Sequence, residues 1–188
     1  MRSQLNIAIR YTLVTTVLLG LVYPLAVTAI AQLTMPHKAD GQLIVRNGVV
    51  IGSAIIGQGF VSDRYFHGRP SAAGNGYDAA NSGGSNLAQS NSALTDRINA
   101  AVSAYQKQNP GKPVPVDLVT TSASGIDPDI SPAAALYQVH TVAAARHLSD
   151  QAVHNLVEGH IQGRQWGIFG EPRVNVLELN LALDSVTR

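Results

Sequence analysis

Residues 11–33 read YTLVTTVLLGLVYPLAVTAIAQL, and this stretch decides the architecture because it contains no charged residue. As an α-helix it is about 34 Å long, which is enough to cross a hydrocarbon core of about 30 Å. Within lipid, a single segment can satisfy all its backbone polar groups only as a helix. The stretch therefore predicts one transmembrane helix.

The flanks of this helix predict its direction. Arg2, Arg10 and the amino terminus precede it, whereas the charges that follow it cancel. Positive flanks stay on the cytoplasmic side of a membrane. We therefore expect residues 1–10 in the cytoplasm and residues 34–188 outside, in a single-pass protein of the cell (inner) membrane.

A cleaved signal peptide is the alternative, because Ala29-Ile30-Ala31 fits a small-x-small cleavage pattern. The apolar part of a signal peptide usually has about 7–15 residues. The present run is much longer, which favours a permanent anchor.

Small and polar residues mark candidate contacts inside the membrane helix. They are Thr15, Thr16, Gly20 and Pro24. Small residues let membrane helices approach each other, and Pro24 leaves the carbonyl one turn earlier without a donor. We expect subunit contacts here and a kink or a packed neighbour at Pro24. The alternative for the threonines is simple tolerance.

The composition excludes several classes of protein. The chain of 188 residues has no cysteine, which rules out disulfides, thiol catalysis and zinc–thiolate or iron–sulfur sites. The formal net charge is +1, so no basic field attracts nucleic acid and we expect no nucleic-acid partner.

The remainder of the chain predicts an α+β domain with a small sheet. Asn47-Gly48 lies between two β-branched runs, which is typical of a type I′ hairpin. Serines at helix-capping positions precede apolar residues with helical spacing. The predicted elements are a hairpin over 44–51, helices over 93–108 and 132–148, a short helix after Ser149, and strands over 114–119 and 173–183, the last with a bulge near Val176. Residues 61–92 form a long Gly/Ser/Asn/Ala-rich loop, and such loops are usually functional or disordered.

Six segments occur in order after the apolar helix: IGQGF (56–60), YFHGRPSA (65–72), SGGSNL (82–87), PVPVDLVT (113–120), SGIDPDISPAAA (124–135) and GEPRVNVL (170–177). Together they closely resemble the C subunit of the Kdp-type potassium-transporting ATPase, over nearly the whole chain. The resemblance implies a non-catalytic accessory subunit. Its partners would be a channel-like, potassium-selecting subunit, an ATP-hydrolysing subunit and possible further small accessory subunits. The role implied is a catalytic chaperone that stabilises the complex and raises the pump's affinity for ATP.

The run Ser82-Gly83-Gly84-Ser85-Asn86 is the candidate nucleotide-binding segment, because its N–H groups can form an anion nest. The alternative is a tight turn with positive φ angles. There is no GxxxxGK[ST] motif, and ATP lies on the side of the membrane opposite to the expected domain. We therefore expect no cofactor held by this chain alone. ATP and K⁺ would be handled through the complex, with coupling through the membrane helix.

Subunit interfaces are expected where long loops must be ordered, at 62–92 and 122–132. A Glu-Pro-Arg run at 171–173 is a further candidate anchor, although an exposed ion pair there would stabilise little. The predicted interface residues outside the helix are Tyr65, Arg69, Asp127, Glu171 and Arg173.

Other hypotheses remain open. A membrane-anchored extracytoplasmic hydrolase is disfavoured because the sequence lacks a GxSxG elbow. A subunit needed only for assembly is a third possibility. The domain would alternatively concentrate cations at a channel mouth through Asp63, Asp78, Asp127, Asp129 and Glu171. The six histidines show no HExxH spacing, so we expect no metal site.

Overall fold

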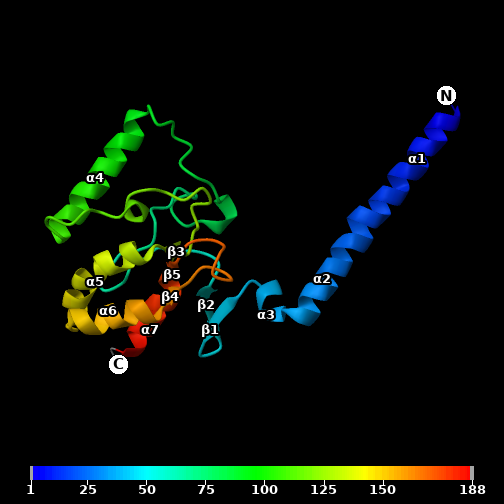
Figure 1. The fold of residues 1–188 in the computed structure, drawn as a ribbon. Helices are drawn as coiled ribbons and strands as arrows, with labels where there is room; N and C mark the ends of the chain where they lie inside the picture. The colour runs from blue at the N-terminus through cyan, green and yellow to red at the C-terminus, as the bar shows by residue number, and fades with distance from the viewer. Residues whose placement is uncertain (1, 187–188) are drawn as a thin grey trace. The chain divides into compact units, whose positions relative to one another are not determined.

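The computed structural model describes residues 2–186, and the chain divides into two compact units, Met1–Ile51 and Gly52–Arg188. The first unit contains one long helix made of α1 (Arg2–Val17), a π-helical turn η1 (Leu18–Val22) and α2 (Tyr23–Thr34) (Figure 1). A short helix, α3 (Pro36–Ala39), follows. The helix from Arg2 to Thr34 has a mean hydropathy of 2.1 and is the only candidate membrane span among the described residues.

The predicted membrane helix is thus present, and it begins earlier than the apolar stretch alone indicated. Pro24 has no N–H, so the carbonyl of Gly20 loses its usual partner four residues later. The backbone accommodates this with the π-helical turn, in which Tyr23 N–H donates to Leu18 O. The irregularity expected at Pro24 therefore takes the form of one wide helical turn.

The predicted hairpin is confirmed. Strands β1 (Leu43–Arg46) and β2 (Val49–Ser53) pair with each other. Asn47 and Gly48 have φ angles of 53° and 78°, and a type I′ turn requires positive φ at both of its central positions.

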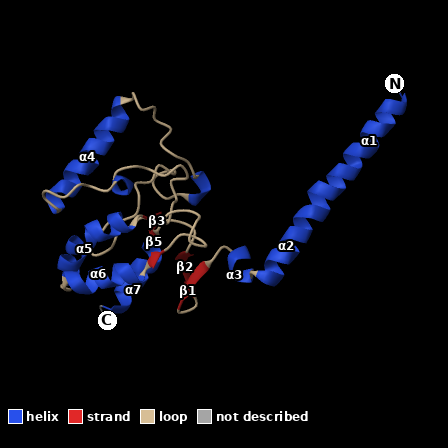
Figure 2. Cartoon of the chain, viewed as in Figure 1, coloured by secondary structure: helices blue, strands red, loops and turns tan. Residues whose placement is uncertain are grey.

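The second unit combines α-helices with a very small sheet (Figure 2). The helices are α4 (Ser92–Gln108), α5 (Pro132–Arg146), α6 (Asp150–Gly159) and α7 (Val176–Val186), of which α5, α6 and α7 supply core residues. The antiparallel sheet has the order β3-β5-β4, from β3 (Asp129–Ile130), β5 (Arg173–Asn175) and β4 (Ile161–Gln162). Two 3₁₀ turns, η2 (Ala79–Asn81) and η3 (Val116–Leu118), lie in the connections.

Helix capping follows the sequence closely. Ser131 Oγ accepts from Ala134 N–H and Ser149 Oγ accepts from Ala152 N–H, as predicted for α5 and α6. At α4 the cap is Asn91, whose side chain accepts from Ala93 N–H, and not Ser92.

The strand predicted over 173–183 is confirmed only for β5 (Arg173–Asn175), and the strand predicted over 114–119 is wrong. Residues 176–186 form α7, not the end of a bulged strand, because Val176, Leu179 and Leu183 share one buried helical face. Residues 114–119 contain the 3₁₀ turn η3 in place of a strand. There the prolines at 113 and 115 remove the N–H groups that a strand ladder would need.

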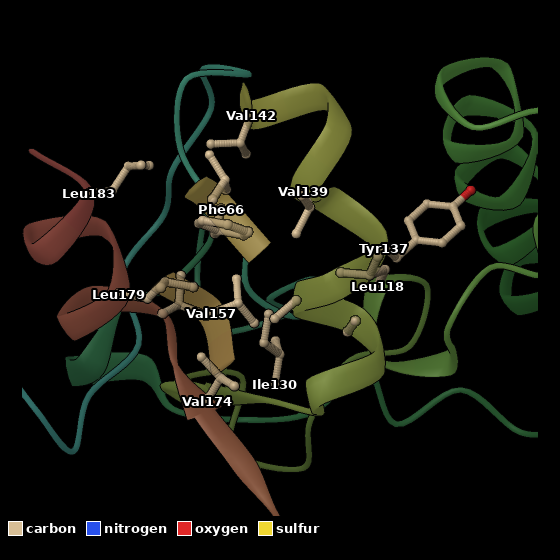
Figure 3. Packing of buried hydrophobic residues seen from close by; sticks show 14 of the residues in the cluster. Phe66, Leu118, Ile130, Tyr137, Val139, Val142, Val157, Val174, Leu179 and Leu183 are labelled. Atoms are coloured by element: carbon tan, nitrogen blue, oxygen red, sulfur yellow. The ribbon is translucent and has the colours of Figure 1, made fainter. Parts of the chain in front are cut away.

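The core lies between the helices and a loop residue, Phe66, which is fully buried. Figure 3 shows Phe66 beside Val139 and Val142 of α5 and Leu179 of α7. A loop thereby provides the largest fully buried side chain of the core, which fixes the start of the 61–92 segment against the helices.

Candidate functional site

The loop 61–92 is held to the helices by two buried side-chain amides. Asn180 of α7 accepts from Phe66 N–H at 2.8 Å and donates to Phe66 O at 2.9 Å. Gln138 of α5 accepts from His67 N–H at 2.8 Å and donates to His67 O at 3.1 Å. Each amide therefore satisfies both backbone groups of one loop residue, as a neighbouring strand would.

A second set of contacts joins this loop to residues 122–127. Ser71 Oγ donates to Gly125 O and accepts from Tyr77 N–H at 2.7 Å. The Tyr77 hydroxyl donates to Arg69 O, and burial raises the pKa of Tyr77 to about 12. Tyr77 is therefore a neutral donor at physiological pH that fixes the backbone from which the Arg69 side chain leaves.

The predicted nucleotide-binding run packs tightly against the same turn. Gly83 N–H and the Ser82 hydroxyl both donate to Ser124 O, at 2.8 and 2.9 Å. Asn86 has a φ angle of 51°. Gly83 and Gly84 do not take positive φ angles, so the run is not the tight turn considered as the alternative. One N–H of the expected anion nest, that of Gly83, is engaged within the protein. Nucleotide binding by Ser82–Asn86 stays a prediction.

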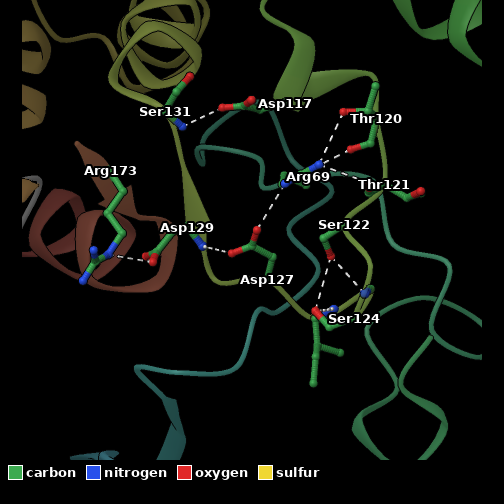
Figure 4. A network of polar contacts seen from close by, with 12 residues as sticks. Arg69, Asp117, Thr120, Thr121, Ser122, Ser124, Asp127, Asp129, Ser131 and Arg173 are labelled. Atoms are coloured by element: carbon green, nitrogen blue, oxygen red, sulfur yellow. Dashed lines mark hydrogen bonds and ion pairs between the residues drawn. The ribbon is translucent and has the colours of Figure 1, made fainter. Parts of the chain in front are cut away.

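Arg69 is the centre of a polar network (Figure 4). Its guanidinium reaches Asp127 Oδ2 at 3.3 Å and donates to Thr121 O at 3.1 Å and to Thr120 O at 3.4 Å. The side chains of Arg69 and Asp127 are 27% and 31% exposed, so one face of the pair is open to solvent. The planar guanidinium thus fixes the turn and still presents charge at the surface.

Carboxylates continue this network towards the sheet. Asp127 Oδ1 accepts from Asp129 N–H at 3.1 Å, and Asp129 Oδ2 lies 3.0 Å from Arg173 Nε. Asn175 donates to Asp129 Oδ1 at 3.3 Å. Burial is the main cause that raises the pKa of Asp129; the Arg173 charge opposes that rise, and the nearby Asp127 carboxylate adds to it.

These groups line a surface cavity of about 440 Å³. Two arginines and four carboxylates contribute to its wall, which gives an excess of negative charge at neutral pH. The lining residues are Arg69, Asp117, Asp127, Asp129, Ile130, Ser131, Glu171, Pro172 and Arg173. Four of the predicted interface residues, Arg69, Asp127, Glu171 and Arg173, therefore meet at one place although they come from distant parts of the sequence.

The other predicted interface residues lie elsewhere. Tyr65 packs against Arg146, with the guanidinium carbon 4.6 Å from the ring centroid, and its hydroxyl is 3.4 Å from Asp184. The candidate contacts of the membrane helix, Thr15, Thr16, Gly20 and Pro24, all belong to the first unit. Of the five acidic residues considered for cation attraction, Asp127, Asp129 and Glu171 line the cavity, whereas Asp63 and Asp78 do not.

Sequence reasoning missed a buried ion pair. The side chain of Arg146, at the end of α5, is only 2% exposed, and it lies 2.8 Å from Asp184 Oδ1 and donates to Arg64 O at 2.6 Å. An arginine in the last turn of an apolar helix resembles an ordinary helix-terminal charge, so nothing in the local pattern signals the long-range partner. Among residues 2–186, no group of three or more His, Cys, Asp or Glu side chains is arranged to hold a metal ion.

We predict that Gly125→Ala disrupts the packing of residues 122–127 against the loop 61–92. Gly125 has a φ angle of 68°, and a Cβ atom would lie 2.5 Å from Gly83 O and 2.7 Å from Ala73 N. The substitution should lower the free energy of unfolding by more than about 2 kcal/mol. Gly111→Ala is the matched control, because Gly111 has a φ angle of 79° but no described atom within 4 Å of its Cβ position. Thermal unfolding of the full chain in detergent measures both, and equal effects would contradict the close packing.

We further predict a pH-dependent effect of Asp129→Asn. Because the pKa of Asp129 is raised on folding, the folded state binds this proton more tightly than the unfolded state does. Ionisation of Asp129 therefore costs stability as the pH rises above the ordinary value of 3.8, and at lower pH, where both states are protonated, it does not. The variant should be at least as stable as the wild type at pH 7, and its advantage should vanish near pH 3. Asp63→Asn is the control, because it neutralises an exposed aspartate. The prediction is disproved if Asp129→Asn loses stability at pH 7 while Asp63→Asn does not.

Comparison with known proteins agrees with the architecture of the chain. The family model described as KdpC, K⁺-transporting ATPase, c chain, matches residues 5–185. The potassium-transporting ATPase KdpC subunit of Koribacter versatilis is 57% identical over 98% of this chain and 95% of its own length. Those of Acidobacterium capsulatum and Methylobacterium nodulans are 55% and 54% identical, over 98% and 91% of this chain and 99% and 91% of their own lengths. The match spans the apolar helix, the loop and the cavity residues together, and the chain therefore belongs to the KdpC family, the c chains of the K⁺-transporting ATPase.

Proposed function

We propose that this protein is a non-catalytic accessory subunit that crosses the cell membrane once, with residues 34–188 outside. It assembles with a potassium-selecting, channel-like subunit and an ATP-hydrolysing subunit. The apolar helix Arg2–Thr34, with Arg2 and Arg10 at its amino-terminal end, supports the anchoring and its direction.

The gathering of Arg69, Asp127, Glu171 and Arg173 around one cavity carries the proposal. Their charges are partly exposed and are held by ion pairs, and those of Arg69 and Asp127 also by backbone contacts, so a partner meets a largely preformed pattern. We assign this surface, the cavity wall, to a subunit interface. Complementary charges on the partner would set its orientation more than its affinity.

The influence on ATP affinity is indirect in this proposal. A subunit that binds one conformation of the pump more tightly than another shifts the equilibrium between them. A tenfold rise in apparent ATP affinity needs a difference of only about 1.4 kcal/mol between the two conformations. Contacts of this size are within the range of a few interface residues, including Thr15, Thr16, Gly20 and Pro24 in the membrane helix.

Direct contact with nucleotide receives less support. Gly83 N–H in the Ser82–Asn86 run is engaged with Ser124 O, and the run lies in the unit that we place outside the cell. A purely structural role in assembly differs from our proposal in one respect, since it leaves the ATP affinity of an assembled complex unchanged.

We predict that Arg173→Glu raises the apparent KM for ATP of the purified complex at least threefold. The variant removes the 3.0 Å contact with Asp129 and places a third carboxylate beside Asp127 and Asp129. Lys107→Glu, the same charge change at an exposed position of α4, is the matched control and should leave KM unaltered. ATPase assays on co-purified complexes measure both.

Three outcomes separate the alternatives. An assembled Arg173→Glu complex with unchanged KM contradicts the assigned interface. Photo-crosslinking of an ATP analogue to residues 82–86 contradicts indirect coupling. Turnover of ester or phosphate substrates by the chain alone supports an anchored hydrolase and contradicts a non-catalytic role.

A further inference from the structure

The connection between β4 and β5 presents three large apolar side chains to solvent. We call residues 164–170 the aromatic tip; it lies in the orange loop between β4 and β5 in Figure 1. Trp166, Ile168 and Phe169 are 82%, 72% and 58% exposed. Other exposed apolar residues of the second unit, such as Val61 and Val116, are single aliphatic side chains. Scattered exposure of that kind is ordinary, whereas a contiguous aromatic patch marks a binding surface.

The backbone of the aromatic tip is ordered. Gln165 and Phe169 exchange two backbone hydrogen bonds, of 2.9 and 3.0 Å, and Ile168 N–H donates to Gln165 O at 3.2 Å. Trp166 and Gly167 both take positive φ angles in the turn. At the base, Arg164 Nη2 contacts both carboxylate oxygens of Glu171, at 2.7 and 2.6 Å. These internal hydrogen bonds would persist if the side chains entered an apolar medium, so insertion would not leave those backbone groups without hydrogen-bond partners.

A membrane surface is within reach of the tip. Residues 35–52 contain α3 and most of the β1–β2 hairpin, and this short folded segment joins the apolar helix to the second unit and tethers that unit near the bilayer. A compact unit of this size is about 37 Å across. Tethering to the bilayer by the chain's own helix also gives the tip a high effective concentration at that surface, so weak intrinsic affinity is sufficient.

The composition of the tip fits the boundary between headgroups and acyl chains. Tryptophan is enriched at that depth because its ring is apolar and its N–H is polar. Phe169 packs edge-on against Trp166, with ring centroids 6.0 Å apart, so the two rings form one wedge. Arg164 is 45% exposed at the base of this wedge, where a guanidinium can meet lipid phosphate.

We propose that the aromatic tip inserts into the headgroup–acyl boundary of the bilayer that the chain's own helix crosses. The second unit is then held to the membrane at two points, the helix and the tip. This inference rests on the membrane anchoring in the proposed function, and the two can fail separately in the experiment below.

Trp166 is the only tryptophan of the chain, so its fluorescence reports on the tip without any labelling. The full chain is reconstituted into phosphatidylcholine/phosphatidylglycerol liposomes, with or without bromine atoms on the upper acyl chain of the lipids. We expect emission shifted to the blue, at least twofold quenching by the brominated lipids and weak quenching by aqueous acrylamide. Ile168→Asp should reduce the bromine quenching at least twofold, whereas Val61→Asp, at a residue that is 96% exposed outside the tip, should not.

Flotation of the liposomes on a density gradient reports separately on the helix. Chain that floats while Trp166 remains open to acrylamide and insensitive to bromine overturns the tip proposal and leaves the anchor intact. Chain that fails to float overturns both. A third measurement uses the assembled complex: if Trp166 is shielded from acrylamide there but not quenched by brominated lipid, the tip contacts a partner subunit and the membrane proposal is wrong.

Discussion

Two side-chain amides position the loop that leads to the proposed interface. Asn180 and Gln138 each bind both backbone groups of one residue in an otherwise irregular loop, and Phe66 fills the core between them. Helices thereby hold an extended segment without a sheet. Arg69 follows two residues after His67, so the direction of its guanidinium depends on contacts that α5 and α7 make with the loop. An irregular loop gains the rigidity of the helical core in this way.

Local signals in the sequence were sufficient for the parts of the fold that depend on neighbouring residues. The type I′ turn at Asn47-Gly48 and the serine caps of α5 and α6 were predicted because each is determined within four residues. The carboxyl-terminal segment was mistaken because leucines at every second position fit a strand, while Val176, Leu179 and Leu183 also fit one face of a helix. Only burial against the core distinguishes the strand spacing of apolar residues from the helix spacing, and burial is a property of the folded chain.

The candidate site likewise combines residues that local sequence indicates with contacts that only the fold determines. Four residues of the cavity wall, Arg69, Asp127, Glu171 and Arg173, were predicted one by one from loops and a Glu-Pro-Arg run. Their meeting at one cavity depends on the pairing of β3 with β5, two strands of two and three residues. Strands this short leave no periodic trace in a sequence. The pairs of Arg146 with Asp184 and of the Tyr77 hydroxyl with Arg69 O join positions whose local sequence gives no sign of a partner. Family resemblance indicates membership of the K⁺-transporting ATPase complex, and the geometry supports the cavity wall as the interface that we propose.

The wide helical turn at Leu18–Val22 has a consequence for how the membrane helix meets its surroundings. A π-helical turn accommodates one additional residue, so the phase of the helix changes by about 100° relative to an uninterrupted α-helix. Residues Arg2–Val17 lie before this turn, and Tyr23–Thr34 lie after it. Positions that a helical wheel would draw as one stripe therefore point in different directions on the two sides of the turn. A straight neighbouring helix would face one stripe before the turn and a rotated one after it.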